Sequence, residues 1–102
     1  MSHTINPNTG IKRVVEQEIR ELAKSCDLDR VILFGSRARG SHCLKSDIDL
    51  AVSGRNVTRF ILDIDECTST LLSFDVIDLN KPIMEELRCA IQAEGIVLYE
   101  KV

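Results

Sequence analysis

The chain of 102 residues has the length of one small domain, and we expect a single domain over residues 1–102. Hydrophobic residues make up 44% and charged residues 28%, which is typical of a globular protein and excludes a disordered one. The formal net charge is −3. Non-specific binding of nucleic acid requires clustered Lys and Arg, so the composition excludes that class of function as well.

The sequence shows neither a signal peptide nor a membrane span. No N-terminal apolar segment resembles a secretory signal, and no apolar run approaches the roughly 20 residues that cross a bilayer. The cysteines are far apart and form no C-x-x-C pair, so we interpret them as reduced structural thiols. They are Cys26, Cys43, Cys67 and Cys89. We expect a cytoplasmic protein.

The first half of the chain predicts a helix, a strand and a loop. Residues 1–10 are polar and predict a loose terminus. From Ile11 apolar residues recur at helical spacing, which predicts a helix that ends near residues 25–29. Residues 31–34 form a short apolar run that favours a buried strand, and residues 36–45 predict a loop with room for one helical turn.

The chain continues with two strands and a helix between them. Residues 47–53 alternate between polar and apolar side chains and predict a strand, which Gly54 ends. Apolar residues spaced from Val57 to Leu71 predict a second helix, and residues 74–79 predict a third strand.

A last helix and strand complete the chain. Pro82 is well placed as the first residue of this helix, because its missing N–H is unneeded there, and Gly95 can end the helix. The predicted buried stripe of the helix consists of Ile83, Leu87, Ala90 and Ile91. Residues 96–99 predict the strand, and the sequence leaves open whether it is central or at an edge. The order predicts an α/β (α+β) fold, a small mixed sheet of about four strands with helices packed on one face.

The strand at residues 31–34 ends in Gly35-Ser36, a pair that can hold a phosphate. Glycine lets the backbone approach a phosphate closely, and the following N–H groups and the Ser36 hydroxyl can donate hydrogen bonds to its oxygens. An ordinary turn at the end of a strand is the alternative interpretation.

Three aspartates on predicted strands suit a divalent cation. Because side chains alternate along a strand, Asp47 and Asp49 share one face, with Cα atoms roughly 6–7 Å apart. Such like charges repel unless a cation lies between them, and oxygen ligands in this arrangement suit Mg²⁺. Asp75 can supply a third carboxylate, whereas alternation points its rival Asp78 to the opposite face; the sequence does not settle which one is near in space. The alternative is a set of unrelated carboxylates that face solvent.

Two linked motifs resemble those of the polymerase-β-type nucleotidyltransferase superfamily. The first is FGSRARG at residues 34–40 and the second is SDIDL at residues 46–50, with ten residues between Ser36 and Asp47. The resemblance spans about residues 30–80. The short length is similar to that of the minimal nucleotidyltransferase (MNT) branch, the antitoxins of HEPN–MNT pairs.

The resemblance implies a polymerase-β-like fold and the transfer of a nucleoside monophosphate, AMP from ATP, to a hydroxyl acceptor. It implies that Gly35 and Ser36 bind the β- and γ-phosphates and that Asp47 and Asp49 ligate two Mg²⁺ ions. It implies that Asp75 ligates one of these ions and helps to deprotonate the attacking hydroxyl. It also implies a partner: the acceptor is a tyrosine of a HEPN toxin, which the chain neutralises as an antitoxin.

Basic residues lie in the loop between the two motifs. Arg37, Arg39 and Lys45 can balance the charge of a triphosphate; we favour this role for Arg39 and interpret the other two as solvated. A catalytic base is one reading of His42, but we interpret it as an exposed loop histidine. We expect a hydrated helix face at Asp63, Asp65 and Glu66.

Two other functions stay open. The first is a non-catalytic binding module that neutralises its partner by occlusion, because nothing in this short chain reads a nucleobase. The second is a transferase for a small hydroxylated molecule such as an aminoglycoside, which needs a homo-oligomer to complete the acceptor pocket. A Rossmann-type dinucleotide binder is excluded, because no G-x-G-x-x-G follows the first strand.

Overall fold

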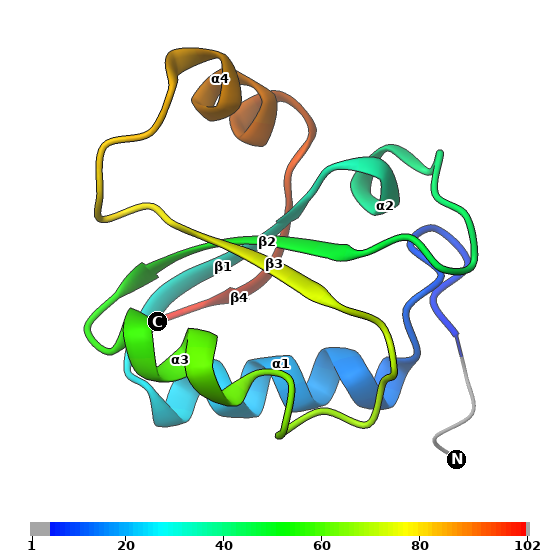
Figure 1. Ribbon diagram of the computed structural model, residues 1–102, viewed down its shortest axis with the longest axis horizontal. Helices are drawn as coiled ribbons and strands as arrows, with labels where there is room; N and C mark the ends of the chain where they lie inside the picture. Colours follow the sequence, from blue (N-terminus) through cyan, green and yellow to red (C-terminus); the bar gives the residue numbers. More distant parts are fainter. Residues whose placement is uncertain (1–4, 102) are drawn as a thin grey trace.

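The computed structural model describes residues 5–101, which form a mixed sheet with helices on both faces (Figure 1). In chain order the elements are α1 (Arg13–Ser25), β1 (Leu28–Phe34), α2 (Ser36–Arg39), β2 (Ile48–Gly54), α3 (Val57–Asp63), β3 (Phe74–Asp78), α4 (Glu85–Glu94) and β4 (Ile96–Glu100). The order of helices and strands is the predicted one, with α2 as the helical turn for which the loop had room. Within residues 5–101, no helix has the length and apolar character that crossing a bilayer requires.

The sheet has the strand order β3-β2-β1-β4. β1 is antiparallel to both β2 and β4, whereas β2 and β3 run parallel. The parallel pair requires a crossover connection, which α3 provides. The predicted mixed sheet of about four strands is confirmed, and β4, whose position the sequence left open, lies at an edge.

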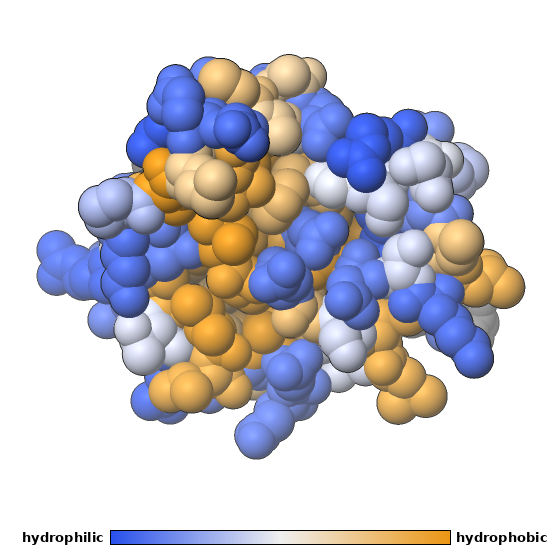
Figure 2. Space-filling model, turned by 45° about the horizontal axis from the view of Figure 1, so that its top comes forward, coloured by the Kyte–Doolittle hydropathy of each residue, from blue (hydrophilic) through white to orange (hydrophobic). Residues whose placement is uncertain are grey.

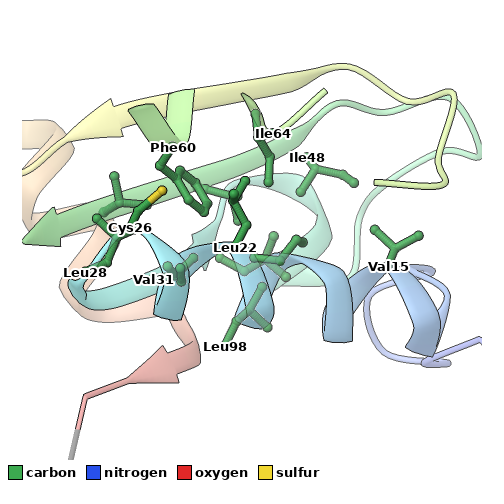
Figure 3. Packing of buried hydrophobic residues seen from close by; sticks show 14 of the residues in the cluster. Val15, Leu22, Cys26, Leu28, Val31, Ile48, Phe60, Ile64 and Leu98 are labelled. Carbon is green, nitrogen blue, oxygen red and sulfur yellow. The ribbon is translucent and has the colours of Figure 1, made fainter. Parts of the chain in front are cut away.

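One face of the sheet packs on α1 and α3, which lie below it in Figure 1. α1 is strongly amphipathic and turns Val15, Ile19 and Leu22 inward. α3 adds the fully buried Phe60, whose ring lies beside Cys26 and Leu22 in Figure 3. The strand residues that face these helices are Val31, Leu33, Ile48, Leu50 and Val52.

We expect Phe60→Ala to lower the free energy of unfolding by about 3–5 kcal/mol, because the change removes a buried ring and leaves a cavity between α3 and α1. Chemical denaturation followed by circular dichroism measures the loss. Leu62→Ala in the same helix is the control, since Leu62 is largely exposed, and it should stay within about 0.5 kcal/mol of the wild type. A Phe60→Ala loss as small as that of the control would show that α3 does not anchor the sheet.

The opposite face is covered too, so the prediction that the helices pack on one face is wrong. α4 lies on this side of the sheet, above it in Figure 1. It turns Leu87 and Ile91 of the predicted stripe onto Phe34 and Ala51, with Ile83 just before the helix. The physical reason is the continuous apolar run of β1, in which Val31 and Leu33 face one layer while Ile32 and Phe34 face the other.

Two predicted helix boundaries are wrong. α4 begins at Glu85, and Met84 before it has extended backbone angles, so Pro82 lies outside the helix. α3 ends at Asp63 and does not reach Leu71, which is fully exposed. The segment after Asp63 forms local hydrogen bonds: the Thr68 hydroxyl donates to the Ile64 carbonyl, and the Leu72 N–H donates to the Thr70 hydroxyl. Such side-chain bonds compete with the helix for the same backbone groups.

The N-terminal segment is ordered where the structure describes it. Residues 1–4 of the predicted loose terminus lie outside the described residues. From Ile5 onward the chain forms a tight turn, in which Ile5 bridges Lys12 and the Asn6 N–H donates to the Ile11 carbonyl at 2.9 Å. Thr9 is buried in this turn, so residues 5–10 are not loose.

Candidate active site

Gly35-Ser36 lies where β1 passes into α2. Gly35 has φ of 78° and ψ of −156°, a conformation that is essentially reserved for glycine. The helix begins at Ser36, and the Gly35 carbonyl accepts the N–H groups of Ala38 and Arg39 at 3.1 and 3.0 Å. The first N–H groups of a helix have no partner within it, so this turn presents donors at the end of the strand.

Asp49 and Asp75 face the same side of the sheet on adjacent strands. They are register partners in the parallel β2–β3 pair, so their Cα atoms are about 4.8 Å apart. On its other side Asp49 is paired with Phe34 of β1, the residue before Gly35. The sheet therefore brings the Gly-Ser turn and two of the three predicted carboxylates to one place.

The rival Asp78 lies on the other face of β3, as its alternation with Asp75 predicted. It is spaced evenly from Phe74 and Val76, which pack on the α1 and α3 layer. Its carboxylate accepts the N–H of Asn80 at 2.9 Å. Of the two candidates, Asp75 is the one that lies beside Asp49.

Asp47 comes one residue before β2, which begins at Ile48 and not at the predicted Asp47. Its side chain is exposed, but its charge acts on Asp49. The peptide next to it is anchored, because the Ile48 N–H donates to the Ser73 carbonyl at 2.9 Å. This bond joins the start of β2 to the start of β3.

The electrostatics of the three carboxylates favour a bound cation. Burial raises the pKa of Asp49 above its ordinary value, and the charges of Asp75 and Asp47 raise it further, against an opposing effect of Arg39. A raised pKa shows that the carboxylate is poorly compensated in the protein alone. A cation among the carboxylates would remove this cost.

The carboxylates of Asp47, Asp49 and Asp75 form a set of oxygen donors that fits Mg²⁺. Among residues 5–101, no three His, Cys, Asp or Glu side chains converge into a preformed metal cage. Mg²⁺ does not need one, because it commonly binds through one or two carboxylates together with water and substrate phosphates. Asp49 and Asp75, with Asp47 close enough for its charge to act on Asp49, match that requirement beside the Gly35-Ser36 turn.

Gly35 has a second role that its sequence position does not show. A Cβ atom added to Gly35 would overlap the Oδ2 atom of Asp49, so the carboxylate lies directly against the Gly35 backbone. Glycine at this position thus leaves space for the Asp49 carboxylate.

The loop residues between the motifs have three different environments. Arg39 forms an ion pair with Glu94 at 2.9 Å and lies near Asp49, with half of its side chain exposed. Lys45 is exposed, as expected. Arg37 is not solvated: it is 1% exposed and donates hydrogen bonds to backbone carbonyls, so that expectation is wrong.

His42 is half-buried, and the expectation of an exposed loop histidine is wrong as well. Its ring packs against the N-terminal turn, where a Cβ on Gly10 would come within 2.6 Å of Nε2. Its Nδ1 atom is buried and has no hydrogen-bond partner within residues 5–101. The turn at residues 5–10, unforeseen in the sequence, is what covers it.

The other acidic and cysteine predictions lie away from this site. Asp65 and Glu66 are exposed, whereas Asp63 pairs with Arg59 at 2.7 Å. Cys26 is buried in the core, and the remaining three cysteines are exposed, so only Cys26 fits a structural thiol; all four are free.

Sequence reasoning missed Glu94. An acidic side chain in the last turn of a helix is unfavourable, because the helix dipole is negative there. This unfavourable position could have indicated that Glu94 has a cationic partner elsewhere in the fold. Arg39 is that partner.

Comparison with known proteins places this geometry in a family. Residues 16–102 match the family model described as "Polymerase beta, Nucleotidyltransferase". The chain belongs to this family. It is a nucleotidyltransferase, and the resemblance seen in the two motifs is confirmed.

One curated relative and two solved structures extend the match. The relative is "Putative protein adenylyltransferase MJ0604" of Methanocaldococcus jannaschii, 33% identical over 81 residues that cover 71% of this chain and 79% of the relative. A crystal structure of a toxin–antitoxin with AMP-PNP is 26% identical, with a TM-score of 0.68 over 84% of this chain and 73% of that chain. A mutant of the toxin–antitoxin MntA-HpeT, at 24% identity and a TM-score of 0.67 over 84% and 73%, shows the same fold.

Proposed function

We propose that this nucleotidyltransferase moves AMP from ATP to a tyrosine hydroxyl of a partner protein, a HEPN toxin that it thereby neutralises in the cytoplasm. The observation that carries the proposal is the register pairing of Asp49 with Asp75 on one face, beside Gly35-Ser36. Support comes from the relative named as a protein adenylyltransferase and from the toxin–antitoxin structure with AMP-PNP. We treat residues 1–102 as one nucleotidyltransferase domain.

Each side chain has a role in this proposal. Ser36 and the N–H groups of its turn bind the β- and γ-phosphates, and Arg39 adds a positive charge after leaving Glu94. Asp47, Asp49 and Asp75 would hold Mg²⁺, two ions in the family mechanism, which would supply positive charge beside the reacting phosphate. The bond from the tyrosine oxygen to the α-phosphate forms as the bond to pyrophosphate breaks, and pyrophosphate leaves. Asp75, at the open edge of the sheet, accepts the proton of the attacking hydroxyl.

The open position of the carboxylates favours a macromolecular acceptor. Asp47 and Asp75 are exposed, and β3 is an edge strand. A small acceptor needs walls that bury most of its surface. A protein acceptor supplies such walls itself. For a small-molecule acceptor, a second copy of this chain would have to supply them, so that alternative requires a homo-oligomer.

A second candidate function is neutralisation by occlusion. A hollow of about 360 Å³ lies between the N-terminal turn and the segment before β3, and Ile5, Leu44 and Leu71 on its rim are strongly exposed. Figure 2 shows that hydrophobic surface, in orange, is also exposed among hydrophilic patches on the α4 side. Exposed apolar clusters are typical of protein-binding surfaces, and binding there needs neither ATP nor Mg²⁺.

Intact-mass spectrometry of the protein encoded beside this one tests the proposal, after incubation with this chain, ATP and Mg²⁺. We expect a gain of one or more AMP units with the wild type and none with Asp47→Asn, which keeps the side-chain size but loses the charge. A stable complex without any mass change would overturn AMP transfer in favour of occlusion. AMP on an aminoglycoside and not on the protein would move the acceptor to small molecules.

A further inference from the structure

Arg37 is a buried cation that no carboxylate within residues 5–101 neutralises. Its side chain is 1% exposed, and all of its described hydrogen bonds go to backbone carbonyls. Burial lowers the pKa of this guanidinium below its ordinary value, which shows that its surroundings do not favour the charge. Burying a cation in this way is costly, so the contacts it makes must have a compensating effect.

The carbonyls bound by Arg37 belong to two loops. Nη1 donates to Thr9 at 2.8 Å in the turn before α1. Nη2 donates to Leu44 at 3.3 Å, and Nε and Nη2 both donate to Ser46 at 3.1 and 2.9 Å. One planar guanidinium thus ties α2 to the N-terminal turn and to the loop before β2.

The position of Ser46 gives this arrangement its significance. Ser46 immediately precedes Asp47, and its own hydroxyl accepts the Cys43 N–H at 2.8 Å, which closes the turn. On the other side of Asp47, the Ile48 N–H is bound to the Ser73 carbonyl. The backbone of Asp47 is therefore held between two anchored peptide groups, one of which depends on Arg37.

Arg37 also lies next to the Gly35-Ser36 turn, the proposed phosphate site. Arg37 directly follows Ser36, so its guanidinium connects the residue after the Gly-Ser pair to the residue before Asp47. We propose that Arg37 is a positioning residue, which fixes Asp47 relative to Gly35-Ser36 through the Ser46 carbonyl. The proposal rests on the proposed function, in which Asp47 is a metal ligand and the turn binds triphosphate.

Only an arginine makes this link completely. Its donors lie in one plane and reach the three carbonyls at once, whereas the ammonium of a lysine is a single compact charge. Arg37→Lys therefore keeps the positive charge but removes the planar set of N–H donors. If Arg37 acted as a charge alone, the lysine variant would behave like the wild type.

Two measurements test the proposal on Arg37→Lys and Arg37→Met. Electron paramagnetic resonance measures Mn²⁺ binding in the presence of AMP-PNP, and we expect at least about 10-fold weaker binding in both variants. Hydrogen exchange without metal measures how firmly the loop before β2 is held in place. We expect about 10-fold faster exchange at the Ser46 and Ile48 amides in both variants.

Arg20→Met is the matched control. Arg20 also donates to a backbone carbonyl, that of Leu98 at 2.8 Å, but joins α1 to β4 away from the carboxylates. It should lower stability while leaving Mn²⁺ binding and both amides at wild-type values. If an Arg37 variant does not fold, Gly10→Ala serves instead, because its Cβ would come within 2.9 Å of Arg37 Nη1, as well as within 2.6 Å of His42 Nε2, and so press on the guanidinium.

Folded Arg37 variants with wild-type Mn²⁺ affinity and wild-type exchange would overturn the positioning role. A wild type that binds no Mn²⁺ with AMP-PNP would instead overturn the metal part of the proposed function. In that case the exchange rates still decide whether Arg37 holds the loop.

Discussion

Asp49→Asn is expected to reduce AMP transfer by at least about 100-fold, because removing even an outer partner of a metal site costs 10–100-fold and Asp49 is proposed as a direct ligand. Asp49 is the central carboxylate of the three, paired with Asp75 on one side and lying against Gly35 on the other. Asparagine has the same shape, so the fold should persist. Transfer to the partner, measured by intact mass over time, gives the rate.

The same substitution is expected to raise stability near neutral pH. Burial and the charges of Asp75 and Asp47 raise the pKa of Asp49. A carboxyl group with a higher pKa in the folded chain binds its proton more strongly there, so stability is lost as pH rises from the ordinary value of 3.8 through the raised value. Asparagine does not titrate, so the variant avoids that loss.

Melting temperatures in chelator, from about pH 3 to about pH 8, measure this effect. The wild type should lose stability relative to Asp49→Asn as the pH rises, and the variant should melt higher near neutral pH. Asp78→Asn is the matched control on the opposite face: its amide oxygen can still accept the Asn80 N–H, and transfer should stay at the wild-type rate. An Asp49→Asn protein that melts below the wild type near neutral pH would contradict the view that burial and charge repulsion make the ionised Asp49 unfavourable.

Local pattern predicted that Asp75 and Asp78 lie on opposite faces of their strand, but not which strands are neighbours. Alternation alone separated Asp75 from Asp78, because side chains on a strand point to opposite faces with a period of two. The register of Asp49 with Asp75 depends on β2 and β3 running parallel. That pairing is set by the α3 crossover and by packing, which involve residues far apart in the sequence.

The predictions that failed depended on tertiary contacts that composition does not reveal. Basic residues in a loop are mostly exposed, and Arg37 departs from this only because three carbonyls surround its guanidinium. His42 is covered by a turn that the polar sequence of residues 5–10 did not predict. The apolar spacing up to Leu71 resembled a helix, but α3 ends at Asp63, and in the segment that follows Thr68 donates to the Ile64 carbonyl and Thr70 accepts the Leu72 N–H.

The coverage of both sheet faces could have been predicted. β1 is apolar at four consecutive positions, and a strand that is exposed on one face alternates instead. Interpreting Ile32 and Phe34 as a second buried face would have predicted a helix on that side, and α4 is the helix whose apolar stripe covers it. The consequence is functional, because α4 brings Glu94 to Arg39 beside the carboxylates.

Gly35→Ala is expected to reduce transfer by about 100-fold, because displacement of a reacting group by about 1 Å can have that effect. Alanine at this position must adopt a conformation that only glycine populates readily, and its Cβ would press on the Asp49 carboxylate. Backbone strain of this kind costs about 1–3 kcal/mol, so stability should fall as well. Rates at saturating ATP, together with chemical denaturation, separate the two effects.

Gly40→Ala separates strain from the collision with Asp49. Gly40 also has a positive φ, 82°, but in the left-handed region at the end of α2, with nothing within 4 Å of an added Cβ. Alanine there costs about 1–2 kcal/mol of backbone energy and touches no carboxylate, so transfer should continue at nearly the wild-type rate. If both variants lose the same activity, strain in the loop explains the loss; if only Gly35→Ala does, the space that glycine leaves for Asp49 is what catalysis requires.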